Sequence, residues 1–394
     1  MHLTRSLHRV LSIAQRSSFL LVASFLVSCG GASEPNAANP TSSSSNPATP
    51  TPTPTPTTTS VTPSTAITDG NGKLKIFILA GQSNMVGFGK VELGADMKSA
   101  TRTPHILGGS GSLRGMVNNN PAAYSFLVDP VKTVTYTVNG VTQTYKDWVS
   151  RDDVWVSSWD GGGIGATTEL RNGALNVGFG DEKVLPAGYI GPEFGFGHTV
   201  GNRLSDKVLL VKTAWGGKSL AVDFRPPSSG GVTGPYYNEL VSKVRIVLAD
   251  VKKYYPAYDG KGFEVAGFGW HQGWNDRDNP AYVAQYEVNL ANLIRDVRKD
   301  LGLPAMPFVI ANTGMAVGDK DSNGFKLVTA QGNVANTSKY PEFAGTVSTV
   351  DTRAFYDPLT SPEIGFVHHW HYNGQSYYQI GEGMGNAMLK LIKP

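Results

Sequence analysis

Cysteine is almost absent from this 394-residue chain, because Cys29 is the only one. A disulfide bond within the chain is therefore excluded. An excess of one charge is also lacking, with 34 basic and 31 acidic residues, and three of the basic ones, Arg5, Arg9 and Arg16, precede residue 28. The rest of the chain is neutral and lacks a basic run, which gives no electrostatic reason to expect binding to nucleic acid or to anionic lipid.

A hydrophobic run long enough to cross a bilayer is missing near the N-terminus. The apolar run over residues 19–27 is too short for a stable spanning helix, and together with the preceding arginines it indicates an export signal over residues 1–28. Residues 26–29 resemble the lipobox at which lipoproteins are cleaved and acylated, so Cys29 is the predicted lipid anchor. A plainly secreted protein is the alternative. Gly30 follows Cys29 where an aspartate commonly retains lipoproteins in the inner membrane, which favours the outer membrane of a bacterial cell envelope over the inner one. A periplasmic or secreted location is the alternative.

Large apolar side chains are missing from residues 29–70, where Ser, Thr, Pro, Ala and Asn dominate. Such a composition cannot bury a core and predicts a disordered tether. Residues 71–394 have ordinary apolar content and no internal low-complexity linker, which predicts one catalytic domain. Within it, residues 100–190 are rich in Asn, Gly and aromatic residues, with short alternating runs. We interpret them as a loop-and-hairpin insertion after the first strand.

Apolar strand candidates alternate with amphipathic helical patterns along the domain. The helical spacing is clear over residues 237–251 and 281–301. Alternation of this kind predicts an α/β fold, a three-layer α/β/α sandwich around a central parallel sheet. The predicted strands are Lys75–Ala80, Lys207–Thr213, Phe263–Trp270, Pro307–Asn312 and Gly345–Val350.

Each predicted strand closes on small or polar residues, and the first of them ends at Gly81-Gln82-Ser83-Asn84. Parallel strands bring their carboxyl ends to one edge of a sheet, where the ligand sites of such folds lie. The sequence therefore predicts a pocket at this edge, with Ser83 in the place of a nucleophile. The alternative for Ser83 is a helix N-cap in an ordinary turn.

A serine nucleophile needs a base, and His368, His369 and His371 near the C-terminus supply candidates. A metal site and a polar loop of stacked aromatics are the alternatives for this cluster. Residues 270–276 carry amides suited to stabilising an oxyanion, or form a structural turn. The Gly-x-Ser-x-Gly elbow is absent, because Met85 occupies its second glycine position.

Five short segments resemble the ordered blocks of the SGNH hydrolase superfamily: Gly81–Met85, Gly191–Glu193, Ala214–Gly217, Trp270–Gly273 and His371–Asn373. Within it, residues 75–392 are most similar to the group of sialate O-acetylesterases and carbohydrate esterase family 6, which includes acetylxylan esterases. Members of this group typically remove acetyl groups from sugars. The resemblance implies that Ser83 is the nucleophile and His371 the base, with His369 as a substitute. It also implies an oxyanion hole made by the amide of Ser83, a glycine amide of Gly217 or Gly191, and Gln272.

The chain departs from the family pattern twice. Trp274 replaces a common glutamate after Gln-Gly, and His368 replaces the aspartate usual three residues before the histidine. The third triad member is therefore open: Asp276 ranks first, Asp351 and Glu363 are further candidates, and a Ser-His dyad with a backbone carbonyl is the alternative. The candidate substrate-binding residues are Gln82, Asn84, Trp215, Lys218, Arg225, His271 and Trp274.

These features predict a lipid-anchored serine esterase of the cell envelope that deacetylates a glycan or sialic acid through a Ser-His(-Asp) acyl-enzyme mechanism. No metal or other cofactor is expected. The expected partners are an acetylated carbohydrate and, through Cys29, a membrane, without nucleic acid or an obligate protein partner. The alternative is a non-catalytic carbohydrate-binding lipoprotein that retains the esterase fold.

Overall fold

The computed structural model describes residues 72–97, 106–160, 163–166, 171–181, 187–363 and 365–392. The predicted signal peptide, the Cys29 anchor and the tether lie outside the described residues. Among the helices that are described, none has the length and apolar character needed to cross a bilayer.

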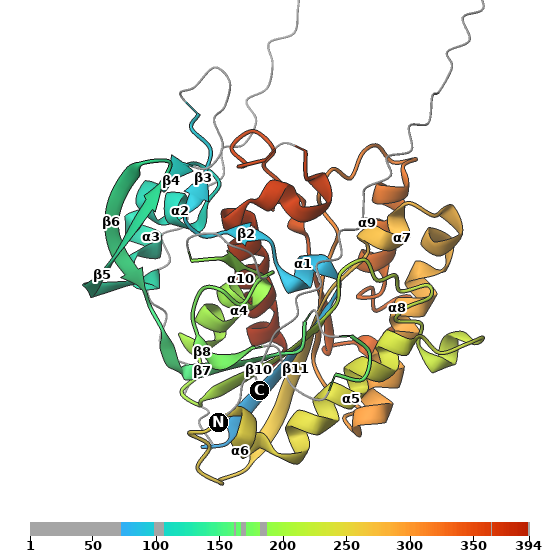
Figure 1. Cartoon of the computed structure of the whole chain (residues 1–394). Helices are drawn as coiled ribbons and strands as arrows, with labels where there is room; N and C mark the ends of the chain where they lie inside the picture. Colours follow the sequence, from blue (N-terminus) through green and yellow to red (C-terminus); the bar gives the residue numbers. More distant parts are fainter. Residues whose placement is uncertain are drawn as a thin grey trace, which may run out of the picture. The chain divides into compact units, whose positions relative to one another are not determined.

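A seven-stranded sheet organises the described residues, in the order β13-β12-β11-β1-β10-β7-β8 (Figure 1). All neighbouring pairs are parallel except β7 and β8, which are antiparallel. Five of these strands coincide with the five predicted ones. The strands are β1 (Leu74–Gly81), β7 (Arg151–Ser158), β8 (Arg171–Leu175), β10 (Val208–Ala214), β11 (Phe263–His271), β12 (Phe308–Ala311) and β13 (Val347–Val350).

Helices cover both faces of the sheet, which confirms the predicted three-layer architecture. Along β1, Ile76 and Ile78 point into one apolar cluster, whereas Phe77 and Leu79 point into another, as alternation in a strand requires. The first cluster packs beneath α5 (Pro235–Ala249), α8 (Pro280–Leu301) and α9 (Asn323–Asn333); the second packs beneath α1 (Ser83–Val86), α2 (Leu113–Asn119), α4 (Pro192–Gly201) and α10 (Gly374–Leu391). Helices α4 and α10 lie side by side (Figure 1).

The long helix α8 has residues at both ends that explain why its bounds could be predicted from the sequence. Pro280 occupies its first turn, and the side chain of Asn279 accepts a hydrogen bond from the amide of Ala281 at 3.0 Å. At the other end Gly302 adopts the left-handed conformation that terminates many helices. The helix therefore begins and ends within one residue of its predicted bounds.

The segment after β1 contains both a hairpin and part of the main sheet. Strands β5 (Val128–Val138) and β6 (Val141–Trp148) form an antiparallel hairpin, in keeping with the predicted insertion. In contrast, β7 pairs in parallel with β10, and Val154 and Val156 are buried in the core. The run over residues 153–157, which the sequence assigns to the insertion, is thus part of a strand of the main sheet. The domain boundaries themselves stay a prediction.

Shorter elements connect these layers. Two small antiparallel sheets pair β2 (Gly89–Lys90) with β9 (Tyr189–Ile190) and β3 (Leu93–Gly94) with β4 (Ile106–Leu107). The short helices are α3 (Pro121–Tyr124), α6 (Val251–Tyr254), α7 (Trp274–Arg277), η1 (Ser125–Leu127), η2 (Pro227–Ser229), η3 (Pro341–Phe343), η4 (Thr352–Phe355) and η5 (Val367–Tyr372).

The carboxyl ends of the central strands are aligned. Gly81 at the end of β1 lies opposite Ala214 of β10 and His271 of β11. The loops that follow these three strands therefore start from one edge of the sheet, where the sequence predicts the site.

Candidate active site

Ser83 lies in the first turn after the central strand. Gln82 is the N-cap of the one-turn helix α1, and Ser83 is its first residue. Ser83 is 7 % exposed. Gly216, in the loop after β10, lies beside it, since a Cβ on Gly216 would come within 3.9 Å of the Ser83 Cβ. The interpretation of Ser83 as an N-cap is therefore wrong, and two strand-end loops meet at its side chain.

Gln82 connects Ser83 to the loop after β11. Its Oε1 accepts hydrogen bonds from the amides of Gly273 at 3.0 Å and Asn275 at 3.2 Å, and its Nε2 lies 3.5 Å from the Ser83 hydroxyl. The side chain is buried. Gln82 is thus engaged in fixing the turn at Ser83, although it was predicted to bind substrate.

The histidine-bearing turn η5 lies against α1. Asn84 donates a hydrogen bond from Nδ2 to the carbonyl of His368 at 3.0 Å, and its Oδ1 accepts one from the hydroxyl of Tyr377 at 2.8 Å. Both functional ends of this buried amide are therefore occupied by protein groups. The structure brings the two predicted catalytic segments together, and it does so through Asn84.

His371 is buried and has a partner on each ring nitrogen. Nδ1 lies 2.9 Å from the carbonyl oxygen of Glu363, and Nε2 lies 2.9 Å from the hydroxyl of Tyr356. A carbonyl can only accept, so Nδ1 carries the proton and Nε2 accepts from Tyr356. Burial raises the pKa of Tyr356, which keeps this hydroxyl protonated. The ring therefore has the tautomer of a general base.

The backbone around His371 is strained. Trp370, His371 and Tyr372 have φ values of +52°, +53° and +57°, in the left-handed region that non-glycine residues rarely adopt. The surrounding contacts, including the hydrogen bond from the His371 amide to the carbonyl of Phe366 at 2.8 Å, hold the turn in this form. Strain of this kind concentrates at functional sites.

Asp276 lies in a different network from His371. Its carboxylate accepts hydrogen bonds from the amides of Leu220 and Ala221 at 2.8 and 2.9 Å, and from Gln272 Nε2 at 2.6 Å. Burial raises the pKa of Asp276 to about 6. Asp276 therefore supports the loop after β10, and these contacts do not support its predicted role as triad acid. The orienting group on His371 is the carbonyl of Glu363, as in the dyad alternative.

The predicted oxyanion donors differ in their availability. Gln272 Nε2 donates to Asp276 and to the carbonyl of Lys218 at 2.9 Å, and the amide of Gly191 donates to Glu193 Oε1 at 2.8 Å. Both donors are thus engaged within the protein, which argues against a part in the oxyanion hole. Gly217 lies in the loop beside Ser83, with open space on its Cβ side and a φ of +69°.

His369 lies in an aromatic stack instead of facing a carboxylate. Its ring is 3.8 Å from that of Phe88 and nearly parallel to it. Burial, with a contribution from His368, lowers the pKa of His369 to about 3. Such a weakly basic ring is a poor substitute for His371 as a general base.

Several predicted substrate-binding residues are structural. Trp215 is buried against Phe224 and Tyr236, the guanidinium of Arg225 donates to backbone carbonyls of its own loop, and His271 is buried with Nδ1 at 3.1 Å from the carbonyl of Ala311. Burial lowers the pKa of His271 to about 4.

Trp274 and Lys218 are more accessible. Trp274 is half-buried, with its ring 6.0 Å from that of His368 and 4.7 Å from the guanidinium carbon of Arg277. Lys218 lies 4.4 Å above the ring of Tyr236 and 3.8 Å from a carboxylate oxygen of Asp223. Of the predicted binding residues, these two keep the best access to a ligand.

Two residues near His371 and Ser83 were not singled out for these roles in the sequence. Tyr356 contacts His371 from η4 without any motif to mark it, and Lys212 contacts the end of α1 from within β10. A lysine in an otherwise apolar strand was the available signal for the second. Across the described residues, no group of three potential metal ligands is assembled.

One comparison with known proteins identifies a family. The model of the family described as "Carbohydrate esterase, sialic acid-specific acetylesterase" matches residues 176–390, more than half of the chain. The matched part begins directly after β8, so it includes His371 but not Ser83. No curated protein matches the chain in sequence.

Solved structures match at low sequence identity. A protein from Arabidopsis thaliana is 18 % identical, with 80 % of this chain and 98 % of that one covered and a TM-score of 0.46. A carbohydrate acetylesterase from Xanthomonas citri is 12 % identical, with 79 % and 55 % covered and a TM-score of 0.47. A peptidoglycan O-acetylesterase is 11 % identical, with 82 % and 93 % covered and a TM-score of 0.34.

Proposed function

The chain belongs to the family of carbohydrate esterases described as sialic acid-specific acetylesterases, and we propose that it is a carbohydrate O-acetylesterase with Ser83 as its nucleophile. One observation carries the proposal. Ser83 begins α1 at the end of the central strand, and the neighbouring Asn84 is hydrogen-bonded to the turn that bears His371. The segments that carry the proposed nucleophile and the proposed base, which lie far apart in the sequence, are thus in contact.

In the proposed reaction, His371 acts as general base through Nε2. The carbonyl of Glu363 holds Nδ1–H, so that the ring stays oriented when it becomes an imidazolium. Ser83 Oγ loses its proton to Nε2 and bonds to the acetyl carbonyl carbon. The sugar oxygen then leaves with that proton, and water hydrolyses the acetyl-serine to acetate in a second cycle.

The negative oxygen of the tetrahedral intermediate needs hydrogen-bond donors. We assign this role to the amides of Ser83 and Gly217. The contact between Gly216 and Ser83 supports it, because this contact sets the loop after β10 next to the nucleophile. The engaged donors of Gly191 and Gln272 are excluded from the hole in this proposal.

Aromatic rings at the rim of the site favour a sugar substrate. Trp274 is half-buried, Phe366 is 39 % exposed, and His368 lies 6.0 Å and 5.9 Å from their respective rings. Partly exposed aromatic faces of this kind stack on the apolar faces of sugar rings. We propose that this rim, with Lys218, contacts the acetylated carbohydrate.

A non-catalytic carbohydrate-binding protein with the same fold is the second candidate. Two observations favour it: His368 stands where sialate O-acetylesterases usually have an acid, and the hydroxyl of Tyr356 is hydrogen-bonded to Nε2 of His371.

For either function, we propose attachment to the bacterial cell envelope through the lipidated Cys29, with the outer membrane favoured.

The test is acetate release by the purified protein from acetylated xylan, acetylated sialic acid and a small aryl acetate. We expect release by the wild type and a loss of at least about a thousandfold in Ser83→Ala, because the nucleophile is removed. Ser157→Ala is the matched control, since Ser157 is a buried serine of the same sheet without a hydrogen-bond partner for its hydroxyl. Its activity should equal that of the wild type.

Full activity in Ser83→Ala would show that the proposed nucleophile is wrong. Absence of acetate release by the folded wild type, combined with sugar binding in calorimetry, would establish the non-catalytic alternative.

A further inference from the structure

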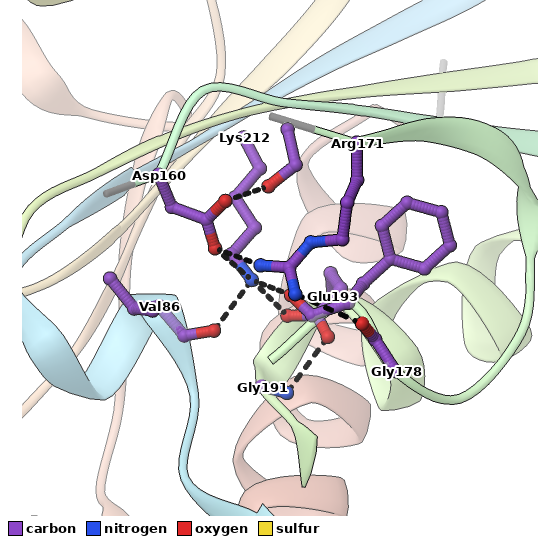
Figure 2. A network of polar contacts seen from close by, with 9 residues as sticks. Val86, Asp160, Arg171, Gly178, Gly191, Glu193 and Lys212 are labelled. Atoms are coloured by element: carbon purple, nitrogen blue, oxygen red, sulfur yellow. Dashed lines mark hydrogen bonds and ion pairs between the residues drawn. The ribbon is translucent and has the colours of Figure 1, made fainter. Parts of the chain in front are cut away.

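Four charged side chains form a cluster next to the end of α1 (Figure 2). Lys212, Asp160 and Glu193 are buried, and Arg171 is half-buried. Lys212 projects from β10 on the same face of the sheet as Leu79 of β1, its partner in register, and it is completely buried. Its Nζ lies 3.1 Å from Glu193 Oε2 and 3.3 Å from Asp160 Oδ2. Arg171 completes the cluster, with its Nη2 3.0 Å from Asp160 Oδ2.

The cluster is balanced in charge. It contains two cations and two anions, so burial leaves no net charge. Asp160 also accepts a hydrogen bond from Ser158 Oγ at 2.5 Å, and Glu193 accepts one from the amide of Gly191 at 2.8 Å. Buried ion pairs seldom stabilise a fold more than apolar packing of the same volume would. We therefore look for the role of this cluster in the positions of the elements that it holds together.

Lys212 uses its remaining donors on backbone that surrounds α1. Nζ donates to the carbonyl of Val86 at 2.6 Å and to that of Phe179 at 2.5 Å. Val86 is the last residue of α1, and Ser83 is the first. The ammonium group therefore holds the helix that carries Ser83 by its far end, from inside the protein (Figure 2).

Helix α1 needs such support because it is a single turn. An isolated turn of four residues does not persist in water, since nucleation costs more than its few hydrogen bonds return. Its amide hydrogen bonds run from Met85 and Val86 to the carbonyl of Gln82, and from Gly87 to that of Ser83. Gln82 anchors the start of the helix on the loop after β11, and Lys212 anchors its end.

Glu193 extends this support to a third element. A Cβ on Gly87 would lie 2.1 Å from the Cα of Gly191, and a Cβ on Gly191 would lie 2.4 Å from Glu193 Oε2 and 2.9 Å from the carbonyl oxygen of Val86. The end of α1 and the start of α4 are therefore in direct backbone contact, and Lys212 is hydrogen-bonded to Val86 of α1 and to Glu193 of α4.

We propose that Lys212 is a positioning residue for Ser83, acting through the carbonyl of Val86, with Glu193 and Asp160 as the counter-charges that keep its ammonium group in place. This inference rests on the proposed role of Ser83 as nucleophile. Lys212 does not touch substrate. It fixes the orientation of α1, so that Ser83 Oγ stays in line with its base and with the acetyl carbonyl.

The test is the charge-balanced double variant Lys212→Met/Glu193→Gln, which removes one charge of each sign and keeps the side-chain volumes. The amide oxygen of the introduced glutamine can still accept from the amide of Gly191. We expect kcat for a small aryl acetate to fall about ten- to a hundredfold, because misplacement of a reacting group by about 1 Å has effects of this size. KM should change less than about twofold, and the pH dependence of kcat should keep its midpoint, since neither the rim nor His371 is altered.

The matched control is Lys75→Met/Glu264→Gln, which breaks another lysine–glutamate pair of the same sheet. Lys75 lies at the start of β1, whereas Ser83 follows the other end of that strand. The Nζ of Lys75 is 2.5 Å from Glu264 Oε1 in the neighbouring strand β11. We expect its kcat to stay within twofold of the wild type, even where its melting temperature falls. A folded Lys212→Met/Glu193→Gln variant with the kcat of this control would overturn the inference.

Hydrogen exchange on the wild type gives a second readout that does not depend on the folding of a variant. The amides of Met85, Val86 and Gly87 should exchange as slowly as those of β1, because both ends of α1 are held. Exchange at the rate of the exposed loops would contradict the inference. A wild type without acetate release would instead refute the proposed function, and the two failures are therefore distinguishable.

Discussion

At the residue scale, the imidazole of His371 is held by one backbone and one side-chain partner. The carbonyl of Glu363 accepts from Nδ1, and the hydroxyl of Tyr356 donates to Nε2. The first contact orients the ring as the proposed base, whereas the second occupies the nitrogen that accepts the proton of Ser83 in the proposed mechanism. Catalysis by His371 therefore requires that the hydroxyl of Tyr356 be displaced.

Removal of this hydroxyl should make the base more available. In Tyr356→Phe, the ring that packs 5.4 Å from His371 is retained and only the competing hydrogen bond is lost. A neutral hydrogen bond has a net value of about 1 kcal/mol, so we expect kcat/KM for an aryl acetate to rise about two- to fivefold. The measurement is kcat/KM from steady-state kinetics of Tyr356→Phe, compared with the wild type and with Tyr356→Leu, which lacks the ring as well as the hydroxyl. A tenfold loss in Tyr356→Phe would show that the hydroxyl takes part in the reaction.

The roles of individual residues were only partly readable from the sequence. Ser83 and His371 stand in short motifs at strand and turn positions, and the structure places their segments together. Asp276 and Gln272 look equally suited to catalysis or binding in the sequence, yet each is hydrogen-bonded to backbone groups more than fifty residues away along the chain. Such assignments depend on long-range hydrogen bonds, which local sequence does not specify.

At the element scale, the site depends on how closely β1 and β11 approach at their carboxyl ends. Gly81 pairs with His271, and a Cβ on Gly81 would lie 2.1 Å from the His271 carbonyl oxygen and 2.8 Å from its carbon. Only glycine permits this contact, because backbone atoms on both sides cannot move aside as a flexible side chain could. The position of Gln82 and Ser83 follows directly from it.

Gly81→Ala should therefore push the two strands apart at the site. We expect a loss of about 2–4 kcal/mol in the free energy of unfolding, at the upper end of overpacking effects, together with reduced esterase activity. Gly332→Ala in α9 is the control, because its Cβ would meet open space and alanine favours the helix. Denaturant unfolding measures both variants. Equal stability of Gly81→Ala and wild type would refute the close approach.

Element types were predictable where a strand or helix carries its own signal. β1 and β10 have largely apolar runs, and α8 has both of its caps. β7 was not recognised as a strand of the main sheet, because the short run Asp153-Val154-Trp155-Val156-Ser157 equally fits a hairpin. Its place beside β10 depends on tertiary pairing.

At the scale of the whole molecule, buried neutral histidines couple stability to pH. Burial lowers the pKa of His198 to about 3, with a further contribution from Arg151, and burial lowers that of His271 to about 4. The unfolded chain binds protons on these rings below about pH 6.5, whereas the folded chain does not until pH 3–4. Stability is thus fully present above pH 6.5 and falls as the pH is lowered.

His198→Phe should make the free energy of unfolding depend less on pH, because it removes one of the two histidines that bind a proton on unfolding. The ring of His198 packs 4.6 Å from that of Phe194, and its Nε2 has no hydrogen-bond partner, so phenylalanine suits the site. Between about pH 4 and 6.5, we expect the slope of unfolding free energy against pH to decrease by about 1.4 kcal/mol per pH unit. Phe126→Leu, which alters a ring packed on His198 without changing a titratable group, should keep the wild-type slope. An unchanged slope in His198→Phe would show that His198 is not buried and neutral.

The proposed function requires an acetyl group to become bonded to Ser83 during turnover. The protein is mixed with excess aryl acetate, quenched in acid within the first turnovers, digested and analysed by mass spectrometry. We expect one acetyl group on the peptide that contains Ser83, and none on that peptide from Ser83→Ala. Acetate release without any acetylated Ser83, or acetylation of another residue during turnover, would contradict the proposed mechanism.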